Sequence, residues 1–319
     1  MKKVGIIGGS GYTGGELIRL VLHHPALALD FIYSTTRPGT PLHDTHVDLL
    51  GTEIPDFTDQ INPAVDVVFL CVGHGKSAGF LKENKFSEAT IIIDLSNDFR
   101  LKNDASFQGY NFVYGLPELQ RETIEKATAI ANPGCFATAI QLALLPLARK
   151  GMITNPVHIN ATTGSTGAGV GLSASSHFSW RNNNLSWYKP FTHQHLGEIG
   201  ETLDNPKLYF LPQRGDFTRG IFASCYTFFD GNLEDAKTIY KDFYKSHPFT
   251  HVSENEVALK QVINTNNCAI HLHQFEDQLL ITSVIDNLIK GASGQAIQNL
   301  NLIMGWEEDL GLRLKASIF

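Results

Sequence analysis

The chain has 319 residues, of which 43% are hydrophobic and 18% charged, and its formal net charge is −7 at pH 7. This length predicts about two domains, and the acidic balance without a basic block argues against a nucleic-acid partner. No apolar run reaches the roughly 18 residues of a membrane span, and no signal-peptide pattern opens the chain. We therefore expect a cytoplasmic protein whose four dispersed cysteines remain reduced thiols.

A glycine-rich turn between a predicted strand and a predicted helix opens the chain, in "KVGIIGGSGYTGGELIRL" (residues 3–20). The glycines fit both G-x-G-x-x-G and G-x-x-G-x-x-G. Such a turn lets backbone N–H groups approach a pyrophosphate at the helix N-terminus, and the strand before it and the helix after it strengthen this interpretation over a plain tight turn. We expect dinucleotide contacts at Gly8, Ser10, Gly11, Tyr12, Thr13 and Gly14.

The second predicted strand, within residues 27–39, indicates which dinucleotide binds. An acid at its end would favour NAD, but its only acid, Asp30, lies near its start. The end instead carries hydroxyls and a guanidinium, which suit the 2′-phosphate of NADP(H). We expect NADP(H) contacts at Ser34, Thr35 and Arg37, with a solvated loop arginine as the alternative for Arg37.

Continuous apolar runs at residues 65–73 and 89–100, and a shorter one before Cys135, predict strands of a sheet covered on both faces. Ligands of such sheets bind beyond the carboxyl ends of the strands. The turns after these strands should therefore lie near one crevice that also contains Cys135. We expect Gly73 to contact the cofactor, and the substrate to contact Ser96, Arg100 and Asn132.

Cys135 follows Asn-Pro-Gly at the start of an apolar segment with helical spacing, "IANPGCFATAIQLALLPLARKG" (residues 130–151). A thiol in the first turn of a helix has a lowered pKa, because the unpaired N–H groups and the positive end of the helix dipole favour an anion. The alternative is a small buried thiol that packs the helix start. The segment therefore offers Cys135 as a candidate nucleophile.

Polar chemistry continues in the second half of the chain. The glycine-rich stretch "TTGSTGAGVG" has no helix pattern after it and predicts a loop. Its Ser165 is a candidate contact for phosphate or substrate oxygens, and we also place Ser165 and Gly167 among the cofactor contacts. A plain flexible loop is the alternative.

A pair of histidines precedes the next predicted helix. His195 and Glu198 are three residues apart, so they can meet on one helix face. The carboxylate would orient the imidazole and support it as a proton carrier, and His193 is a candidate substrate contact. No further ligands cluster nearby, which argues against a metal site, and ordinary loop histidines remain the alternative.

Two arginines flank the next predicted loop, and both Arg214 and Arg219 are suited to clamp a carboxylate or phosphate at two points. The remaining strand patterns predict a mainly antiparallel sheet in an α+β domain. The final apolar helix carries small residues and Asn287 in its first turns. Asn287 is a candidate cofactor contact, with packing as the alternative.

Eight segments together resemble the N-acetyl-gamma-glutamyl-phosphate reductase family of arginine biosynthesis, which is related to aspartate-semialdehyde dehydrogenase. They follow the family order over almost the whole chain: "GGSGYTGGEL", "DLSNDFRL", "VYGLPEL", "NPGCFAT", "TGSTGAG", "HQHLGEI", "FTRGI" and "DNLIKGASGQAIQNLNLIMG". The resemblance implies NADPH-dependent reduction of an N-acyl-gamma-glutamyl phosphate to the semialdehyde through a cysteine thioester. An aspartate-semialdehyde dehydrogenase and a non-catalytic NADP-binding regulator are the alternatives.

The resemblance also implies an α/β fold in two domains. A Rossmann-like NADP-binding domain would span residues 1–133, with a C-terminal helix at about 294–319 packed back on it. An α+β domain at 134–293 would carry catalysis, substrate binding and assembly into a homo-oligomer, a dimer or a tetramer. By position, Cys135 becomes the nucleophile and His195 the acid/base, Arg219 and the loop around Ser165 become substrate contacts, and Asn287 comes near the nicotinamide.

Two stretches depart from the family pattern: "QRGDF" before "TRGI", and "HFSWRNNNLSWYKPF" at residues 177–191. Both should lie near the acyl end of the substrate. The N-acyl group is therefore left open, with acetyl favoured and succinyl as the alternative. Arg181, Lys189 or Arg214 would meet the extra carboxylate of a succinyl group.

Overall fold

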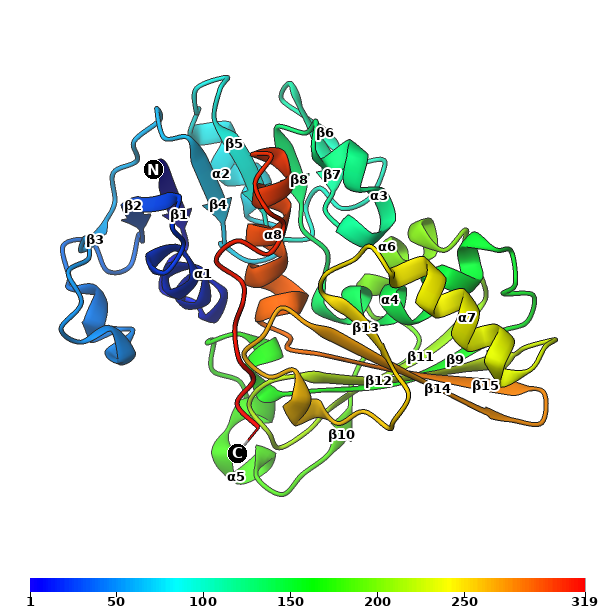
Figure 1. The fold of residues 1–319 in the computed structure, drawn as a ribbon. Helices are drawn as coiled ribbons and strands as arrows, with labels where there is room; N and C mark the ends of the chain where they lie inside the picture. The colour runs from blue at the N-terminus through cyan, green and yellow to red at the C-terminus, as the bar shows by residue number, and fades with distance from the viewer. Residues whose placement is uncertain (319) are drawn as a thin grey trace. The chain divides into compact units, whose positions relative to one another are not determined.

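The computed structural model describes residues 1–318, and the chain divides into two units, coloured along the sequence in Figure 1. Unit 1 consists of Met1–Pro133 and Ala292–Leu312. Unit 2 consists of Gly134–Gly291 and the residues that follow Leu312. The chain therefore enters unit 2 one residue before Cys135 and leaves it just after the segment that contains Asn287.

Unit 1 is built on an eight-stranded sheet with the order β3-β2-β1-β4-β5-β8-β7-β6. The strands are β1 (Lys2–Ile7), β2 (Leu27–Tyr33), β3 (Phe57–Thr58), β4 (Val67–Leu70), β5 (Ile91–Asp94), β6 (Ser106–Phe107), β7 (Tyr110–Tyr114) and β8 (Ala129–Ala131). All neighbours are parallel except β6 and β7. The strand order reverses direction between β1 and β4, and ligands of open α/β sheets bind at such a switch point.

The helices of unit 1 are α1 (Tyr12–Leu22), α2 (Ser77–Glu83), α3 (Pro117–Ile124) and α8 (Gly294–Ile303), with 3₁₀ turns at Leu42–Asp44 and Val47–Leu49. Helix α8 packs against α1 and α3. The prediction of a helix as far as residue 319 was wrong, because α8 ends at Ile303. Gly305, with φ 65°, takes the left-handed conformation that commonly terminates a helix. The residues after Leu312 belong to unit 2, where the backbone N–H of Ser317 donates to the carbonyl of Ile263.

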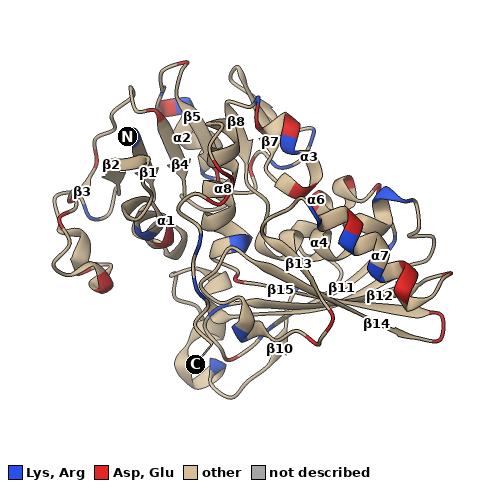
Figure 2. Ribbon diagram, in the orientation of Figure 1, with Lys and Arg blue, Asp and Glu red and all other residues tan. Residues whose placement is uncertain are grey.

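Unit 2 contains a seven-stranded sheet with the order β10-β11-β9-β12-β15-β14-β13. Its strands are β9 (Val157–Thr163), β10 (Ser186–Trp187), β11 (Leu208–Arg214), β12 (Ile221–Phe228), β13 (Thr250–Ser253), β14 (Cys268–Phe275) and β15 (Gln278–Ile285). The pairs β9–β11 and β13–β14 are parallel, and the other four neighbouring pairs are antiparallel. The expectation of a mainly antiparallel sheet is confirmed. Figure 2 marks Lys, Asp and Glu positions along α7 (Leu233–Tyr244), whereas β12 and β15 contain no charged residue.

Helix α4 (Cys135–Arg149) lies at the core of unit 2, where it packs against β12 and β15. Every residue from Phe136 to Leu147 is buried. The hydroxyls of Tyr240 and Tyr244, on α7 (Leu233–Tyr244), donate to carbonyl oxygens of α4 at 2.5 Å each. The position of Cys135 is thus fixed by a buried helix rather than by a surface loop.

The remaining helical segments of unit 2 are shorter: α5 (Phe178–Arg181), α6 (His195–Thr202), 3₁₀ turns at Ser165–Ala168, Ala174–Ser176 and Leu259–Gln261, and a π-helical turn at Ile289–Ser293 that continues past the unit boundary. Among residues 1–318, no helix is long and apolar enough to cross a membrane.

Candidate active site

Cys135 is the first residue of α4, as predicted, and it is partly exposed. The preceding Gly134 is the N-cap, with extended backbone angles of φ −70° and ψ 152°. The first N–H groups of a helix lack intrahelical partners, and together with the helix dipole they stabilise an anion at this end. The location therefore favours the thiolate form of Cys135.

Glycines on two sides of Cys135 permit close packing around it. A Cβ on Gly134 would lie 2.4 Å from Nε2 of His195. A Cβ on Gly291 would lie 2.8 Å from Cβ of Cys135. A side chain at either position would displace its neighbour, so glycine at 134 allows His195 to approach the peptide that precedes Cys135, and glycine at 291 lets its own segment pack against Cys135.

His195 and Glu198 are both buried on the first turn of α6. Nε2 of His195 lies 3.9 Å from Oε1 of Glu198, which is beyond hydrogen-bond length but within ion-pair range when the imidazole is protonated. The other carboxylate oxygen, Oε2, accepts a hydrogen bond from the backbone N–H of Gly134 at 3.0 Å. Glu198 thus links the histidine to the peptide before Cys135, a contact between segments that sequence spacing alone did not predict.

His193 lies directly beside His195. Its Nδ1 accepts the backbone N–H of His195 at 3.2 Å, and the two ring centroids are 4.6 Å apart in an edge-to-face arrangement. The rings of Phe136 and Phe210 pack against it. His193 is therefore a buried neighbour that holds the backbone of His195, and its role as a substrate contact stays a prediction.

Tyr188 joins this cluster through an edge-to-face contact with the ring of His193, although no sequence pattern singled it out. Burial and then the nearby charge of Cys135 raise the pKa of Tyr188 to about 12, so its hydroxyl stays protonated at neutral pH. The guanidinium of Arg214 stacks on the Tyr188 ring at 4.6 Å. Nε of Arg214 is buried and has no hydrogen-bond partner within residues 1–318. The predicted substrate contact Arg214 thus lies on the Tyr188 side of the Cys135 cluster.

Arg181, in contrast, is occupied by its own loop. Its guanidinium donates to the carbonyls of Ser175, Asn184 and Arg214 and to the hydroxyl of Ser186. Arg181 is only 5% exposed, and this burial lowers the pKa of its guanidinium. Its hydrogen bonds to Ser186 and Arg214 tie β10 to β11. Arg181 therefore holds the 175–186 loop, and its role as a substrate contact stays a prediction. Lys189 is exposed and donates to the side chain of Gln194.

The glycine-rich segment around Ser165 is hydrogen-bonded to the residues just before β12, which include Arg219. Gly164, Ser165 and Thr166 donate their backbone N–H groups to the carbonyls of Gly220, Phe217 and Thr218, respectively. Ser165 is partly exposed and Gly167 is exposed. These contacts place Ser165, within unit 2, beside the backbone segment 217–220 that carries Arg219, and they do not fit a plain flexible loop.

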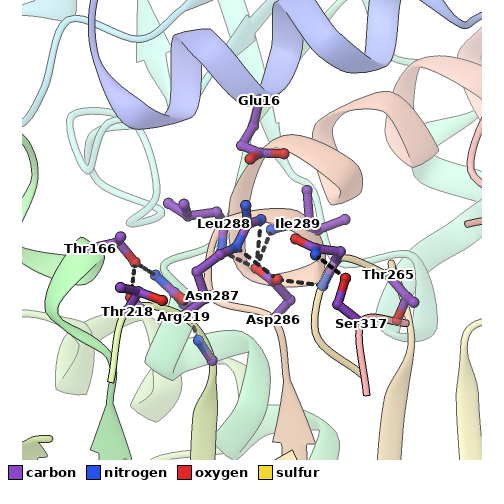
Figure 3. Close-up of polar contacts among 12 residues, drawn as sticks. Glu16, Thr166, Thr218, Arg219, Thr265, Asp286, Asn287, Leu288, Ile289 and Ser317 are labelled. Carbon is purple, nitrogen blue, oxygen red and sulfur yellow. Dashed lines mark hydrogen bonds and ion pairs between the residues drawn. The ribbon is translucent and has the colours of Figure 1, made fainter. Parts of the chain in front are cut away.

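Arg219 and Asn287 belong to a polar network shown in Figure 3. Nε and Nη2 of Arg219 donate to the two carboxylate oxygens of Asp286, at 3.1 and 3.2 Å. Oδ1 of Asn287 accepts the Gly220 N–H at 2.6 Å, and its Nδ2 donates to Oγ1 of Thr166 at 3.0 Å. Both side-chain atoms of Asn287 therefore have partners in unit 2, and its role as a cofactor contact stays a prediction.

Unit 1 contains a glycine turn suited to a dinucleotide. Gly8 has φ 81°, and a Cβ there would lie 2.6 Å from the carbonyl oxygen of Cys71. A Cβ on Gly14 would lie 2.7 Å from Cα of Gly9. Gly11, the N-cap of α1, is less crowded, since a Cβ there would make only an ordinary van der Waals contact with the carbonyl oxygen of Gly8, at 3.8 Å. Glycine is thus required at positions 8 and 14 for the close packing of the turn, which leads directly into the helix N-terminus where a pyrophosphate would bind.

The other predicted cofactor residues surround this turn in unit 1. Ser34, at the end of β2, is buried, whereas Thr35 and Arg37 are exposed. Asp30 lies within the strand, where it pairs with Lys3 at 3.2 Å and accepts from Asn62. The end of β2 therefore carries no carboxylate. Tyr12 is exposed, Ser10 and Thr13 are partly exposed, and the exposed Gly73 follows β4, the neighbour of β1.

Three predicted substrate contacts have mainly internal partners in unit 1. Oγ of Ser96 donates to the buried Asp94 carboxylate at 2.7 Å. Nε of Arg100 donates to the carbonyl of Asn132 at 2.8 Å. Nδ2 of Asn132 donates to the carbonyl of Ala292, and its Oδ1 accepts from Asn299. These contacts hold the turns at the ends of β5 and β8 within unit 1, and the substrate role of the three residues stays a prediction.

Comparison with known proteins places this geometry in a family. Residues 3–127 match the model of the semialdehyde dehydrogenase NAD binding domain, and residues 135–287 match that of the semialdehyde dehydrogenase dimerisation domain. Among solved structures, aspartate semialdehyde dehydrogenase II from Vibrio cholerae superimposes with a TM-score of 0.74 at 14% identity, covering 96% of this chain and 98% of that one. Aspartate semialdehyde dehydrogenase with NADP from Candida albicans gives a TM-score of 0.67 at 15% identity, covering 95% of this chain and 98% of that one. These likenesses show the shared fold.

Sequence relatives are much closer. The N-acetyl-gamma-glutamyl-phosphate reductase of Flavobacterium johnsoniae is 60% identical, that of Christiangramia forsetii 56% and that of Parabacteroides distasonis 50%, each over 100% of both chains. The glycine turn, the Cys135 helix and the His195–Glu198 pair all lie within these full-length matches. This chain therefore belongs to the N-acetyl-gamma-glutamyl-phosphate reductase family of semialdehyde dehydrogenases.

Proposed function

We propose that the chain reduces an N-acyl-gamma-glutamyl phosphate to the N-acyl-glutamate 5-semialdehyde, with NADPH as the reductant and release of phosphate. The observation that carries this proposal is Cys135 at the N-terminus of a buried helix, with His195 against the preceding peptide. The full-length relatives, which are named N-acetyl-gamma-glutamyl-phosphate reductase, support the same reaction.

The first half of the reaction needs a nucleophile that is also a good leaving group, and a thiolate is both. His195 takes the proton of the Cys135 thiol. The sulfur attacks the γ-carbonyl carbon, the bond to the phosphate oxygen breaks, and phosphate leaves with the proton from His195. Glu198, 3.9 Å from Nε2 of His195, stabilises the imidazolium while it carries that proton. A thioester on Cys135 results.

The second half requires a hydride donor, and unit 1 contains the residues to hold one. Bound NADPH supplies the hydride that turns the thioester carbonyl into the aldehyde. The Gly8–Gly14 turn would hold the pyrophosphate, and Ser34, Thr35 and Arg37 would hold the 2′-phosphate. The Cys135 sulfur leaves as a thiolate, stabilised by the α4 N-terminus, and uptake of a proton from solvent restores the starting thiol.

The acyl end of the substrate would lie on the Tyr188 side of the cluster. We favour acetyl, the group in the names of the relatives. A succinyl group is the second candidate, because the buried Nε of Arg214 has no hydrogen-bond partner within residues 1–318 and is suited to bind a carboxylate. Arg214 is favoured over Arg181 for this role, because the guanidinium of Arg181 already donates to four oxygens of its surroundings.

A substrate comparison in the oxidative direction tests the reaction. We expect the protein to reduce NADP only when an N-acylated glutamate semialdehyde and phosphate are both present, because phosphate must release the thioester. The assay compares the N-acetyl and N-succinyl compounds with the free semialdehyde and with aspartate semialdehyde. A tenfold preference between acyl groups needs about 1.4 kcal/mol, roughly what one charge-assisted hydrogen bond supplies.

Arg214→Ala serves as the matched variant of this comparison. If the succinyl compound is preferred through Arg214, the variant should lose that preference while its rate with the acetyl compound stays close to wild type. Higher activity on aspartate semialdehyde than on both acylated compounds would overturn the proposed function in favour of the aspartate alternative.

The cofactor preference gives a separate test. We expect a higher kcat/KM with NADPH than with NADH, because β2 ends in hydroxyls and Arg37 with no carboxylate. Arg37→Ala should lower the NADPH value by about tenfold to a hundredfold, the effect of losing a charged hydrogen bond, and leave the NADH value nearly unchanged. Steady-state rates with both cofactors measure this. Equal use of the two cofactors by the wild type contradicts the assignment.

We further propose that the chain works as a homo-oligomer, a dimer or a tetramer, in the cytoplasm. The match of residues 135–287 to a dimerisation domain supports the assembly. The requirement for a reduced Cys135 supports a reducing compartment. A non-catalytic NADP-binding regulator would need neither the thiol nor the buried His195–Glu198 pair.

A further inference from the structure

The carboxylate of Asp286, directly after β15, is completely buried and oriented by backbone donors. Its Oδ1 accepts the N–H groups of Leu288 and Ile289 at 2.8 and 3.1 Å, and its Oδ2 accepts the N–H of Asn264 at 2.8 Å (Figure 3). Because these donors come from two segments of the backbone, the carboxylate has a fixed orientation, and any cation that binds it is fixed in turn.

Arg219 is the cation that binds this carboxylate. Its Nε and Nη2 contact one carboxylate oxygen each, at 3.1 and 3.2 Å, which is the two-point geometry that sets the plane of a guanidinium. The Arg219 side chain is 18% exposed, whereas Asp286 is completely buried. One edge of the guanidinium is thus held from the protein interior while the side chain still reaches the surface.

The segment that contains Asp286 also packs against Cys135. The backbone N–H of Gly291 donates to the carbonyl of Asp286 at 2.9 Å, closing a wide turn. At the far end of this turn, Gly291 is in close contact with Cys135. Residues 286–291 form a single turn of unit 2. One end of this turn is Asp286, which binds Arg219, and the other end is Gly291, which contacts Cys135.

We propose that Asp286 is a positioning residue that holds the guanidinium of Arg219 in the orientation in which it binds an anionic oxygen of the acyl-phosphate substrate beside Cys135. This inference rests on the proposed function. Asp286 does not contact the substrate and acts through Arg219. Neighbouring Asn287 fixes Gly220 and Thr166 next to the same arginine, which gives the guanidinium a rigid surrounding.

The test is a double-mutant cycle on the full-length protein. Asp286→Asn removes the charge with little change in volume, and Arg219→Met removes the cation. We expect either single variant to raise the KM for the acyl phosphate about tenfold or more, equivalent to about 1.4 kcal/mol, with the KM for NADPH unchanged. The double variant should be no worse than Arg219→Met. Additive losses would overturn the proposal, because they would mean that Asp286 acts independently of Arg219.

Arg219→Lys is a variant that keeps a positive charge beside the buried Asp286 carboxylate. If orientation by Asp286 matters, lysine cannot replace the two-point contact, and the KM should rise by an amount similar to that of Asp286→Asn. A KM close to wild type would overturn the proposal, because charge alone would then suffice. The matched control is Asp66→Asn, which breaks the exposed Lys2–Asp66 pair in unit 1 and should leave both KM values unchanged.

Inorganic phosphate binding separates this inference from the proposed function. Phosphate should raise the melting temperature of the wild type, and both Asp286→Asn and Arg219→Met should reduce that rise. An inactive wild type with this pattern would refute the proposed reaction and support the positioning role. A wild type whose melting temperature does not respond to phosphate, or a rise that survives in Asp286→Asn, would overturn the positioning role.

Discussion

Replacing Cys135 by alanine should abolish turnover and leave NADP(H) binding nearly intact. The Cys135 sulfur is the atom that would form and release the thioester, and no other side chain in the cluster could take its place as a sulfur nucleophile. The glycine turn belongs to unit 1, whereas Cys135 begins a buried helix of unit 2, so the substitution leaves the dinucleotide contacts in place. Steady-state rates and NADPH fluorescence titration measure the two properties.

Alkylation kinetics sharpen this test, because the other thiols differ in environment. Burial raises the pKa of Cys71 to about 12 and that of Cys225 well above its ordinary value, so both stay protonated near neutral pH. We expect one rapidly alkylated thiol in the wild type, protected by substrate and absent from Cys135→Ala. The matched control, Cys268→Ala, should keep its activity and the rapid thiol. More than about a few per cent residual activity in Cys135→Ala would refute a covalent mechanism.

His195→Asn should lower kcat by roughly 10²–10⁴, the usual loss when a general acid/base is removed. This corresponds to about 3 to 5 kcal/mol of transition-state stabilisation. Asparagine keeps a polar group of similar size but cannot carry a proton. Because the imidazole lies against Gly134 and not in unit 1, the KM for NADPH should stay near the wild-type value.

His193→Asn is the paired variant, and it should cost less. Its Nδ1 holds the backbone N–H of His195, so its loss disturbs the position of the catalytic imidazole without removing the proton carrier. The pH dependence of kcat distinguishes the two variants, because only His195→Asn should remove an ionisation from the profile. A larger loss in kcat at His193 than at His195 would reverse the assignment.

The fold was predictable where local patterns are strong. The apolar runs of β4, β5 and α4 and the glycine turn before α1 define their elements through side-chain chemistry that is visible within a few residues. The C-terminal segment was predicted less well. A glycine ends α8 after Ile303, and the residues after Leu312 join unit 2 through contacts such as Ser317 with Ile263. Such contacts between distant parts of the chain leave no periodic signal.

The candidate site divides in the same way. The positions of Cys135 and of the His195–Glu198 pair at helix starts follow from local sequence, since helix N-termini have recognisable residues. The partners of the arginines do not. Arg181, Arg214 and Arg219 look alike in the sequence, but the first ties its own loop, the second stacks on Tyr188 and the third is held by Asp286. Only the folded sheet brings these partners together.

The sequence by itself therefore determined the class of fold, the dinucleotide turn and the family, and it offered Cys135 as the candidate nucleophile, because each of these is encoded by short segments of residues adjacent along the chain. Tertiary structure alone decided which polar groups are occupied: the Glu198 contact with Gly134, the Tyr188–Arg214 stack and the buried Asp286 carboxylate. The physical reason is that the partners of a buried polar group depend on which segments meet in three dimensions. Buried polar groups need hydrogen-bond partners, and which partners they find is decided by the packing of distant segments and not by the spacing of residues along the chain.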